Sequence, residues 1–363
     1  MPPISIMIKP ASSLCNMRCA YCFYHDVAEN REDFAYGKMT EETAEQIIGK
    51  ALAFAEGEPV SFAFQGGEPL LAGLDYFRFF TRTVKEHNRK NSPVSYGLQT
   101  NGLLLDPKWA AFLREERFLV GLSLDGDKEA NRYRLKAGGQ NAWYAILNAA
   151  VLLKREAVDF NILTVLTGYC AEHSTEIYQF FKKKGFQYLQ FIPCLRPFGD
   201  KSEDERYMTP EQYAKFLIQL FQLYVKDYMR GDYTSIRQFD NYVHLYLGEN
   251  PEQCGMAGHC TFQYVVEGNG NVYPCDFYCV DQWQLGNIHT QDFLEFSQGK
   301  LARSFIEESL AVPEKCKTCG YYPICRGGGC KRLRESREYC AAYRAFFSTS
   351  LPLFRVFAGE RRP

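Results

Sequence analysis

Three cysteines near the N-terminus, Cys15, Cys19 and Cys22, have a spacing that suits a reactive iron–sulfur cluster. In a C-x3-C-x2-C segment, three thiolates can hold three irons of a [4Fe–4S] cube and leave the fourth iron open. A reaction centre needs such an open iron, whereas an electron-transfer cluster does not. Zinc is the alternative, but this spacing is unusual for zinc and a fourth ligand would be needed.

Of the nine cysteines between residues 254 and 340, eight form a further pattern, and eight is the number that two fully ligated [4Fe–4S] clusters require. They follow the pattern C-x5-C-x14-C-x40-C-x2-C-x5-C-x4-C-x9-C and are Cys254, Cys260, Cys275, Cys316, Cys319, Cys325, Cys330 and Cys340. A zinc domain is the alternative, although two paired C-x2-C segments are absent. We expect the remaining thiols, Cys170, Cys194 and Cys279, to be ordinary buried cysteines; for Cys279, four residues after Cys275, the alternative is a competing ligand.

The composition limits the kind of protein that carries these thiols. With 363 residues, 46% hydrophobic and 15% aromatic, the chain can form a large α/β domain and a smaller one. The net charge of −1 and the lack of a long Lys/Arg run indicate neither a nucleic-acid nor an anionic-membrane partner. No signal peptide or membrane span is recognisable, so we expect a cytoplasmic protein whose clustered cysteines bind metal.

The elements that must position the cysteines alternate between strands and helices over the first 200 residues. Strands are expected at Ser5–Ile8, Val60–Phe64, Ser95–Leu98, Leu119–Leu124, Phe160–Leu166 and Tyr188–Ile192. Helices are expected at Glu41–Ala55, Lys108–Glu116, 142–157 and Thr175–Lys184, with Thr40, Asp106 and Ser174 as their start signals. Six such units predict an α/β fold, a partial (β/α)6 TIM-like barrel with a parallel sheet covered by helices.

Several strands run into small or polar loops, where parallel sheets bind ligands. These loops are Gln65-Gly66-Gly67-Glu68-Pro69, Gln99-Thr100-Asn101-Gly102 and Asp125-Gly126, and each alone is also consistent with a simple turn. After a helix at about Pro210–Met229, a β-hairpin is expected from Phe262–Val266 and Asn271–Tyr273. We therefore expect a barrel domain over 1–235 and a metal-stabilised C-terminal domain over 236–363.

The first cysteine segment resembles the signature of the radical S-adenosylmethionine (SAM) superfamily, C-x3-C-x-aromatic-C, with Tyr21 as the aromatic residue. The GGEP segment resembles the glycine-rich stretch of that superfamily. The resemblance implies SAM as a cofactor, with Tyr21 near the adenine and further SAM contacts at Gly67, Ser123, Arg134 and Leu195. For Arg134 the alternative is a surface salt bridge.

The later cysteines resemble the SPASM extension of radical SAM enzymes that modify peptides and proteins. This resemblance implies a nearer cluster on Cys254, Cys260, Cys275 and Cys330, and an outer one on Cys316, Cys319, Cys325 and Cys340. The segments IKPASSLCNMRCAYCFYH, FAFQGGEPLLAG, LQTNG, FLVGLSLDG, VYPCDFY and LGNI together resemble the anaerobic sulfatase-maturating enzymes. The run from Cys325 to Cys330 is one residue longer than usual and the stretch before Cys340 is short, which leaves the ligand count intact.

The resemblance implies oxidation of a cysteine or serine to Cα-formylglycine in a sulfatase polypeptide with a C/S-x-P/A-x-R motif. Three [4Fe–4S] clusters and SAM would supply the radical and accept the second electron, with a donor such as flavodoxin or ferredoxin. Asp276 matches the proton acceptor of the family, and partial burial would raise the pKa of its carboxyl; the alternative is a structural hydrogen-bond acceptor. Tyr24 and Gln65 are expected to line the peptide groove or to be packing residues.

Two other functions stay open on the sequence. One is a SPASM-type peptide maturase that forms thioethers, epimers or crosslinks, although no peptide-binding domain is expected before a cluster motif that begins at Cys15. The other is a zinc-stabilised adaptor or an electron carrier, which iron analysis would separate because three clusters imply about twelve irons per chain. The sequence leaves the choice between a cysteine and a serine target open.

Overall fold

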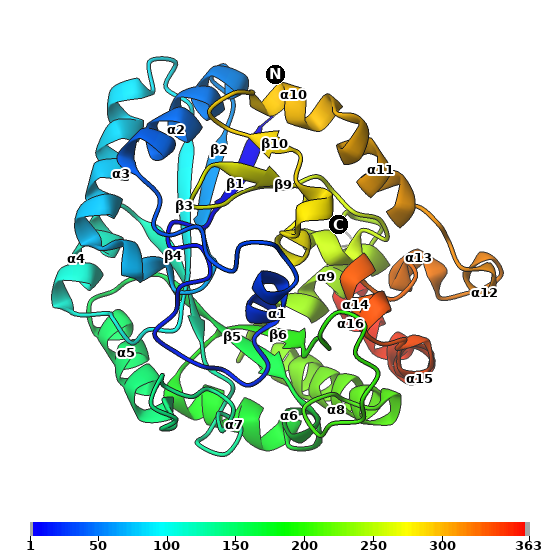
Figure 1. The fold of residues 1–363 in the computed structure, drawn as a ribbon. Coiled ribbons are helices and arrows are strands. Elements are labelled where there is room, and N and C mark those ends of the chain that lie inside the picture. The colour runs from blue at the N-terminus through cyan, green and yellow to red at the C-terminus, as the bar shows by residue number, and fades with distance from the viewer. Residues whose placement is uncertain (1–2, 360–363) are drawn as a thin grey trace. The chain divides into compact units, whose positions relative to one another are not determined.

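The computed structural model describes residues 3–359 (Figure 1). The chain forms two compact units. Unit 1 joins the chain up to Ser123 with Arg134–Phe160 and Phe262–Ile306. Unit 2 joins Leu124–Tyr133 and Asn161–Thr261 with the chain from Glu307 onward. The units therefore do not divide at the expected boundary between residues 235 and 236, because the segment that contains the hairpin packs with the N-terminal strands.

The strands of unit 1 are β1 (Ile4–Ile8), β2 (Val60–Phe64), β3 (Val94–Thr100), β4 (Phe118–Ser123), β8 (Tyr264–Val266), β9 (Asn271–Tyr273) and β10 (Gly286–Asn287). Their order is β10-β9-β8-β1-β2-β3-β4. Strands β8, β1, β2, β3 and β4 pair in parallel, whereas β9 and β10 are antiparallel to their neighbours. The hairpin of β8 and β9 is confirmed, and it extends the parallel sheet at β1.

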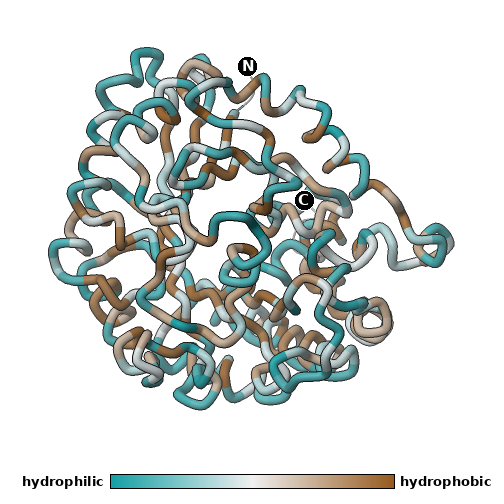
Figure 2. Tube along the Cα trace, in the orientation of Figure 1, coloured by the Kyte–Doolittle hydropathy of each residue, from teal (hydrophilic) through white to brown (hydrophobic). Residues whose placement is uncertain are grey.

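Helices α1 (Phe23–Glu29), α2 (Glu41–Ala55), α3 (Leu74–His87), α4 (Pro107–Glu115), α5 (Trp143–Arg155) and α10 (Phe293–Gln298) belong to the same unit. The expected start signals of α2 and α4 are confirmed, since Thr40 accepts from the Thr43 amide and Asp106 from the Trp109 amide. Figure 2 shows brown, apolar stretches on the strands of unit 1 and alternating colours along its amphipathic helices.

Unit 2 contains β6 (Tyr188–Pro193), β7 (Ser235–Ile236) and all but the first residue of β5 (Phe160–Leu166), paired in parallel. Its longer helices are α7 (Ser174–Lys184), α8 (Pro210–Met229), α9 (Arg237–Tyr246) and α15 (Cys340–Ser350). The expected cap at Ser174 is wrong: α6 (Gly168–Glu172) continues almost directly into α7 through His173, so Ser174 is helical and its buried hydroxyl has no hydrogen-bond partner.

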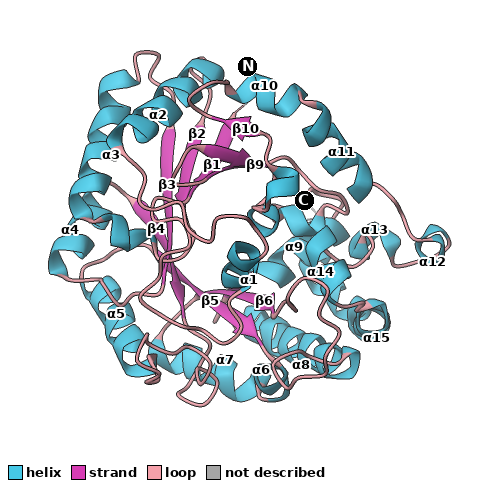
Figure 3. Ribbon diagram, in the orientation of Figure 1, coloured by secondary structure: helices cyan, strands magenta, loops and turns pink. Residues whose placement is uncertain are grey.

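Short helices and single turns make up the rest, as Figure 3 shows for the C-terminal part of unit 2. They are α12 (Glu314–Lys317), α13 (Tyr322–Cys325), α14 (Lys331–Ser336) and α16 (Arg355–Gly359), with 3-10 turns at Pro69–Ala72, Cys254–Met256, Asp276–Tyr278, Asp281–Trp283 and Leu351–Phe354. Helix α11 (Lys300–Ser309) precedes α12. Within residues 3–359, no helix is both long and apolar enough to cross a membrane.

Candidate functional site

Cys15, Cys19 and Cys22 lie on one loop of unit 1, between the end of β1 and the start of α1. Burial raises the pKa of the Cys15 thiol to about 11 and also raises the pKa of Cys22, and the charge of Cys22 adds to the effect on Cys15. Three thiols on one loop, none of them in a disulfide bond, are donors of the kind that a [4Fe–4S] cluster takes as thiolates. The donor set therefore fits an iron–sulfur cluster.

No group of three or more His, Cys, Asp or Glu side chains lies close enough to share one metal ion, as far as residues 3–359 are concerned. A four-iron cluster has its irons at separate corners, so its thiolate ligands do not meet at one point. None of the fourteen cysteines forms a disulfide bond, and Cys170, Cys194 and Cys279 are buried, as expected.

The Gly67 backbone lies directly against the cysteine loop. The Gly67 amide donates to Ser12 O at 2.8 Å, and the next amide donates to Leu14 O at 2.8 Å. A Cβ atom at Gly67 would stand 2.1 Å from Leu14 O, so only glycine allows this approach. The glycine-rich segment thus supports the loop that carries Cys15, one residue beyond Leu14.

Glu68 is a buried carboxylate that the sequence analysis did not single out. It accepts hydrogen bonds from the Leu70 amide at 3.1 Å, the Thr100 hydroxyl at 2.8 Å and the Asn101 amide at 2.8 Å. Burial raises its pKa to about 7, although these hydrogen bonds oppose the shift. Asn101 in turn donates to the Cys15 sulfur at 3.8 Å. Glu68 therefore connects the loops after β2 and β3 to the cysteine loop.

Three of the predicted SAM contacts besides Gly67 lie in unit 1. Arg134 is 6% exposed, which rules out a surface salt bridge, and its guanidinium carbon lies 5.5 Å from the centroid of the Tyr21 ring. Ser123, the last residue of β4, accepts a hydrogen bond from Gln99 Nε2 at 2.9 Å. The fourth, Leu195, is buried in unit 2.

Asp276 begins the 3-10 turn after Cys275 and is 6% exposed. Its Oδ1 forms an ion pair with Lys9 Nζ, and its Oδ2 accepts from Gln65 Nε2 at 2.6 Å. Lys9 and Gln65 directly follow β1 and β2, whose carboxyl ends lie side by side in the parallel sheet. Gln65 thus contacts the predicted base, and Lys9, a fully buried cation, was missed because no local pattern marks a charge that will be buried.

Tyr24 is buried beside this pair. Its ring centroid is 3.7 Å from Lys9 Nζ, and its hydroxyl donates to Glu267, which directly follows β8. Glu267 also pairs with Arg31 at 2.9 Å. Burial, with the charge of Glu267, raises the pKa of Tyr24 well above its ordinary value. Its predicted substrate contact stays a prediction.

The later cysteines of unit 2 form two electrostatically coupled groups. Cys330 has its pKa raised to about 11 by burial and by the charges of Cys260 and Cys254. Cys325 has its pKa raised to about 12 by burial and by the charges of Cys340 and Cys316. Cys319 also contributes to the raised pKa of Cys316. The two groups contain seven of the eight cysteines predicted as auxiliary-cluster ligands, whose assignment stays a prediction, and the eighth, Cys275, belongs to unit 1.

The long run between Cys325 and Cys330 turns through Gly327, Gly328 and Gly329, whose φ angles are 85°, 88° and 102°. This left-handed backbone favours glycine. The extra residue is thus accommodated within the loop, and both cysteines keep their places in the two groups.

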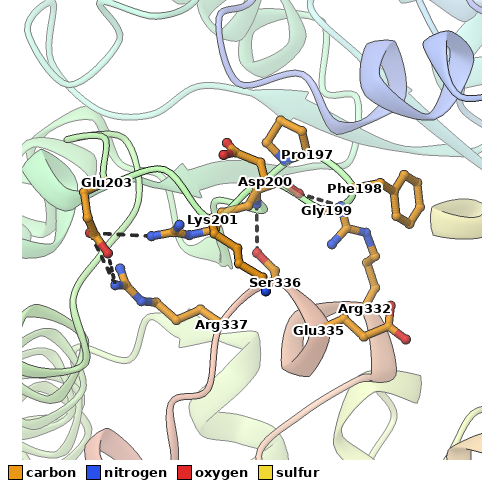
Figure 4. A pocket seen from close by; sticks show the side chains of 11 residues that line it. Pro197, Phe198, Gly199, Asp200, Lys201, Glu203, Arg332, Glu335, Ser336 and Arg337 are labelled. Carbon is orange, nitrogen blue, oxygen red and sulfur yellow. Dashed lines mark hydrogen bonds and ion pairs between the residues drawn. The ribbon is translucent and has the colours of Figure 1, made fainter.

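A polar cavity of about 300 Å³ lies in unit 2 between the loop after β6 and α14 (Figure 4). The Arg196 amide donates to Ser336 Oγ at 2.8 Å, and Arg332 Nη2 donates to Arg196 O at 2.5 Å. Arg196 follows Leu195, and α14 follows Cys330 directly. Leu195, a predicted SAM contact, and Cys330, a predicted cluster ligand, thus each directly precede a segment that lines this cavity.

Two family models match the chain: the radical SAM superfamily over residues 10–181 and an iron–sulfur cluster-binding domain, SPASM, over residues 254–320. The chain is 44% identical to the cysteine-type anaerobic sulfatase-maturating enzyme of Clostridium perfringens, over 97% of both chains. It is 29% identical to the serine-type anaerobic sulfatase-maturating enzyme of Bacteroides thetaiotaomicron, over 96% of this chain and 90% of the relative.

A solved structure of native anSMEcpe with bound AdoMet and Cp18Cys peptide superposes with a TM-score of 0.94. It is 42% identical in sequence, and the match covers 99% of this chain and 100% of that chain. The likeness therefore extends over both units.

Proposed function

Since the chain belongs to the anaerobic sulfatase-maturating enzymes, a radical SAM family with a SPASM extension, we propose that it oxidises a cysteine in a sulfatase polypeptide to Cα-formylglycine. It is an oxidoreductase with the radical SAM fold, and it uses [4Fe–4S] clusters and SAM. The observation that carries the choice of cysteine is the 44% identity to a cysteine-type relative, against 29% to a serine-type one.

We assign the SAM-binding cluster to Cys15, Cys19 and Cys22, and SAM contacts to Tyr21, Gly67, Ser123, Arg134 and Leu195. When bound, this cluster and SAM supply the radical that removes a hydrogen atom from the substrate Cβ. The buried guanidinium of Arg134 suits the SAM carboxylate. The backbone of Gly67, packed on the cysteine loop, supports a role in holding the cofactor site together.

Asp276 is the proposed acceptor for the proton of the substrate thiol. A general base must be held within reach of the proton that it takes, and the contacts from Lys9 and Gln65 fix both carboxylate oxygens. Burial of the group supports exclusion of water from the reaction.

The two auxiliary clusters are assigned to the ligand sets predicted from the sequence, and they would accept the second electron. The electrostatic coupling within unit 2 supports seven of these eight ligands. We also infer a one-electron donor such as flavodoxin or ferredoxin. We also propose the cytoplasm as the location, because cysteines that bind metal instead of forming disulfides fit a reducing compartment. By function, we retain a radical SAM part over 1–235 and a SPASM part over 236–363.

Anaerobic reconstitution followed by mass spectrometry tests the proposal. A C-x-P-x-R peptide should be converted to formylglycine, and its serine counterpart at least about tenfold more slowly. Iron analysis should give about twelve irons per chain. A thioether or crosslinked product without formylglycine would overturn the proposal, and faster conversion of the serine peptide would overturn the choice of cysteine.

A further inference from the structure

The buried pair of Lys9 and Asp276 is the feature of unit 1 that the reaction alone does not explain. The Lys9 side chain is fully buried and that of Asp276 nearly so. Removing two charges from water is costly, and an apolar pair of the same size often serves stability equally well. Stability by itself is therefore a poor reason for a lysine at this position.

The sheet brings the partners together in a defined way. Because β8, β1 and β2 are adjacent and parallel, Glu267, Lys9 and Gln65 occupy corresponding positions just beyond their carboxyl ends. The Lys9 amide donates to Val266 O at 2.9 Å, so the backbone at the root of the lysine side chain continues the pairing of β1 with β8. The ammonium thus extends from rigid backbone rather than from a flexible loop.

The contacts of Asp276 form a clamp with two points, Lys9 Nζ on Oδ1 and Gln65 Nε2 on Oδ2. A carboxylate has about four lone-pair positions, so one donor on each oxygen leaves positions that can receive a proton. The Tyr24 ring covers the ammonium at 3.7 Å and limits where it can move. Burial, the largest single effect, would lower the pKa of Lys9, but the charges of Asp276, Cys279 and Glu267 together with the hydrogen bond to Asp276 outweigh it, and the pKa is raised.

We propose that Lys9 is a positioning residue that holds the Asp276 carboxylate in place for proton transfer, with Gln65 holding its second oxygen. The inference rests on the proposed function, because it concerns the base of that reaction. It predicts that Lys9 acts through Asp276 and has no separate effect on radical formation.

The test measures formylglycine formed per deoxyadenosine in the reconstituted holoenzyme, at saturating C-x-P-x-R peptide. Lys9→Met should lower this ratio about 10- to 100-fold, because small displacements of catalytic groups have effects of that size. Lys9→Arg, which keeps the charge, should restore part of it. A fall of less than threefold in Lys9→Met, with normal iron content, would overturn the proposal.

The double variant Lys9→Met/Asp276→Asn separates positioning from an independent role. If Lys9 acts through Asp276, the double variant should have the same ratio as Asp276→Asn within about twofold. A further loss of tenfold would assign Lys9 a role of its own and contradict the inference. Lys182→Met is the matched control, since Lys182 pairs with Asp227 at 2.7 Å in unit 2, and it should leave the ratio unchanged.

Urea unfolding of the same variants gives a readout that needs no catalysis. Lys9→Met leaves a buried carboxylate without its cation, so it should unfold at lower urea than the double variant, which leaves no unpaired charge. If the loss of stability in the double variant equals the sum of the losses in the two single variants, the pairing of Lys9 with Asp276 is contradicted. If Lys9→Met does not fold, Gln65→Leu can be used to measure formylglycine per deoxyadenosine instead. If Gln65 holds the Asp276 carboxylate, this ratio should fall while the KM for the peptide stays unchanged. A raised KM with an unchanged ratio would overturn the proposal.

A wild-type enzyme that cleaves SAM but makes no formylglycine from either peptide would refute the proposed function. The unfolding comparison would still test the pairing of Lys9 with Asp276, so the two failures are distinguishable.

Discussion

The cysteine loop of unit 1 and the later cysteines of unit 2 both present thiols that can bind iron, but different kinds of structure hold the thiols in the two units. In unit 1 the thiols occupy one loop, and the loops after β2 and β3 support it through Gly67 and Glu68. In unit 2 most of the later thiols lie on turns or on short helices such as α12 and α13, and Cys340 begins the longer helix α15. Such short helices are marginal alone, so the first site is formed by the sheet and the second depends more on metal.

The largest expected effect comes from removing the ligands of the first site. The variant Cys15→Ala/Cys19→Ala/Cys22→Ala should form no deoxyadenosine but retain about eight of twelve irons, because the ligand sets are separate. Chromatography of deoxyadenosine and iron analysis check this. Reductive SAM cleavage by this variant would show that the reactive cluster is assigned to the wrong cysteines.

Two glycine variants compare the loop that supports the first cysteine site with the loop between Cys325 and Cys330 in unit 2. Gly67→Ala should lower deoxyadenosine formation about 100-fold or more, because its Cβ would displace the loop at Leu14 O. Gly328→Ala should cost only about 1–2 kcal/mol of stability, as alanine takes the left-handed conformation there. Product assays and urea unfolding distinguish the two, and equal effects of both variants on deoxyadenosine would contradict the comparison.

Glu68 gives the first site a predicted pH dependence. Its pKa is raised from 4.5 to about 7 in the folded chain, so the folded protein keeps this proton at pH values where the unfolded chain loses it. The stabilisation is complete below pH 4.5 and is lost as pH rises through about 7, by up to about 3 kcal/mol. Urea unfolding at several pH values should show this loss of stability in the wild type and not in Glu68→Gln. If stability changes with pH in the same way in both proteins, the raised pKa of Glu68 is contradicted.

Removal of iron should destabilise unit 1 less than the C-terminal part of unit 2. After chelation, amides of residues 310–345 should exchange with solvent faster, whereas those of β1 to β4 should keep most of their protection. Hydrogen-exchange mass spectrometry before and after chelation measures the difference. Equal loss of protection in both regions would show that the sheet does not support the first site independently.

The same contrast explains what the sequence revealed. Strands such as Val60–Phe64 and helices such as Glu41–Ala55 were predictable because local apolar periodicity and caps encode them. The cysteine motif was likewise local. Lys9 and Asp276, by contrast, are 267 positions apart, and only the pairing of β8 with β1 brings their segments together.

Glu68 was missed for a related reason. Within the glycine-rich segment it reads as one more polar loop residue, and its partners lie on the following strand and its loop. The same holds for the mistaken cap at Ser174, where the preceding short helix α6 decided the geometry. Contacts between loops of neighbouring strands follow from topology rather than from any one segment.

The most direct measurement of the central claim, that Asp276 accepts the substrate proton in a formylglycine-forming oxidation, uses Asp276→Asn. Asparagine keeps the size but cannot accept the proton at neutral pH. Deoxyadenosine should still form at an appreciable rate, while formylglycine falls about 10²–10⁴-fold, the usual contribution of a base. A fall of less than about threefold in formylglycine, with normal iron content and SAM cleavage, would contradict the claim.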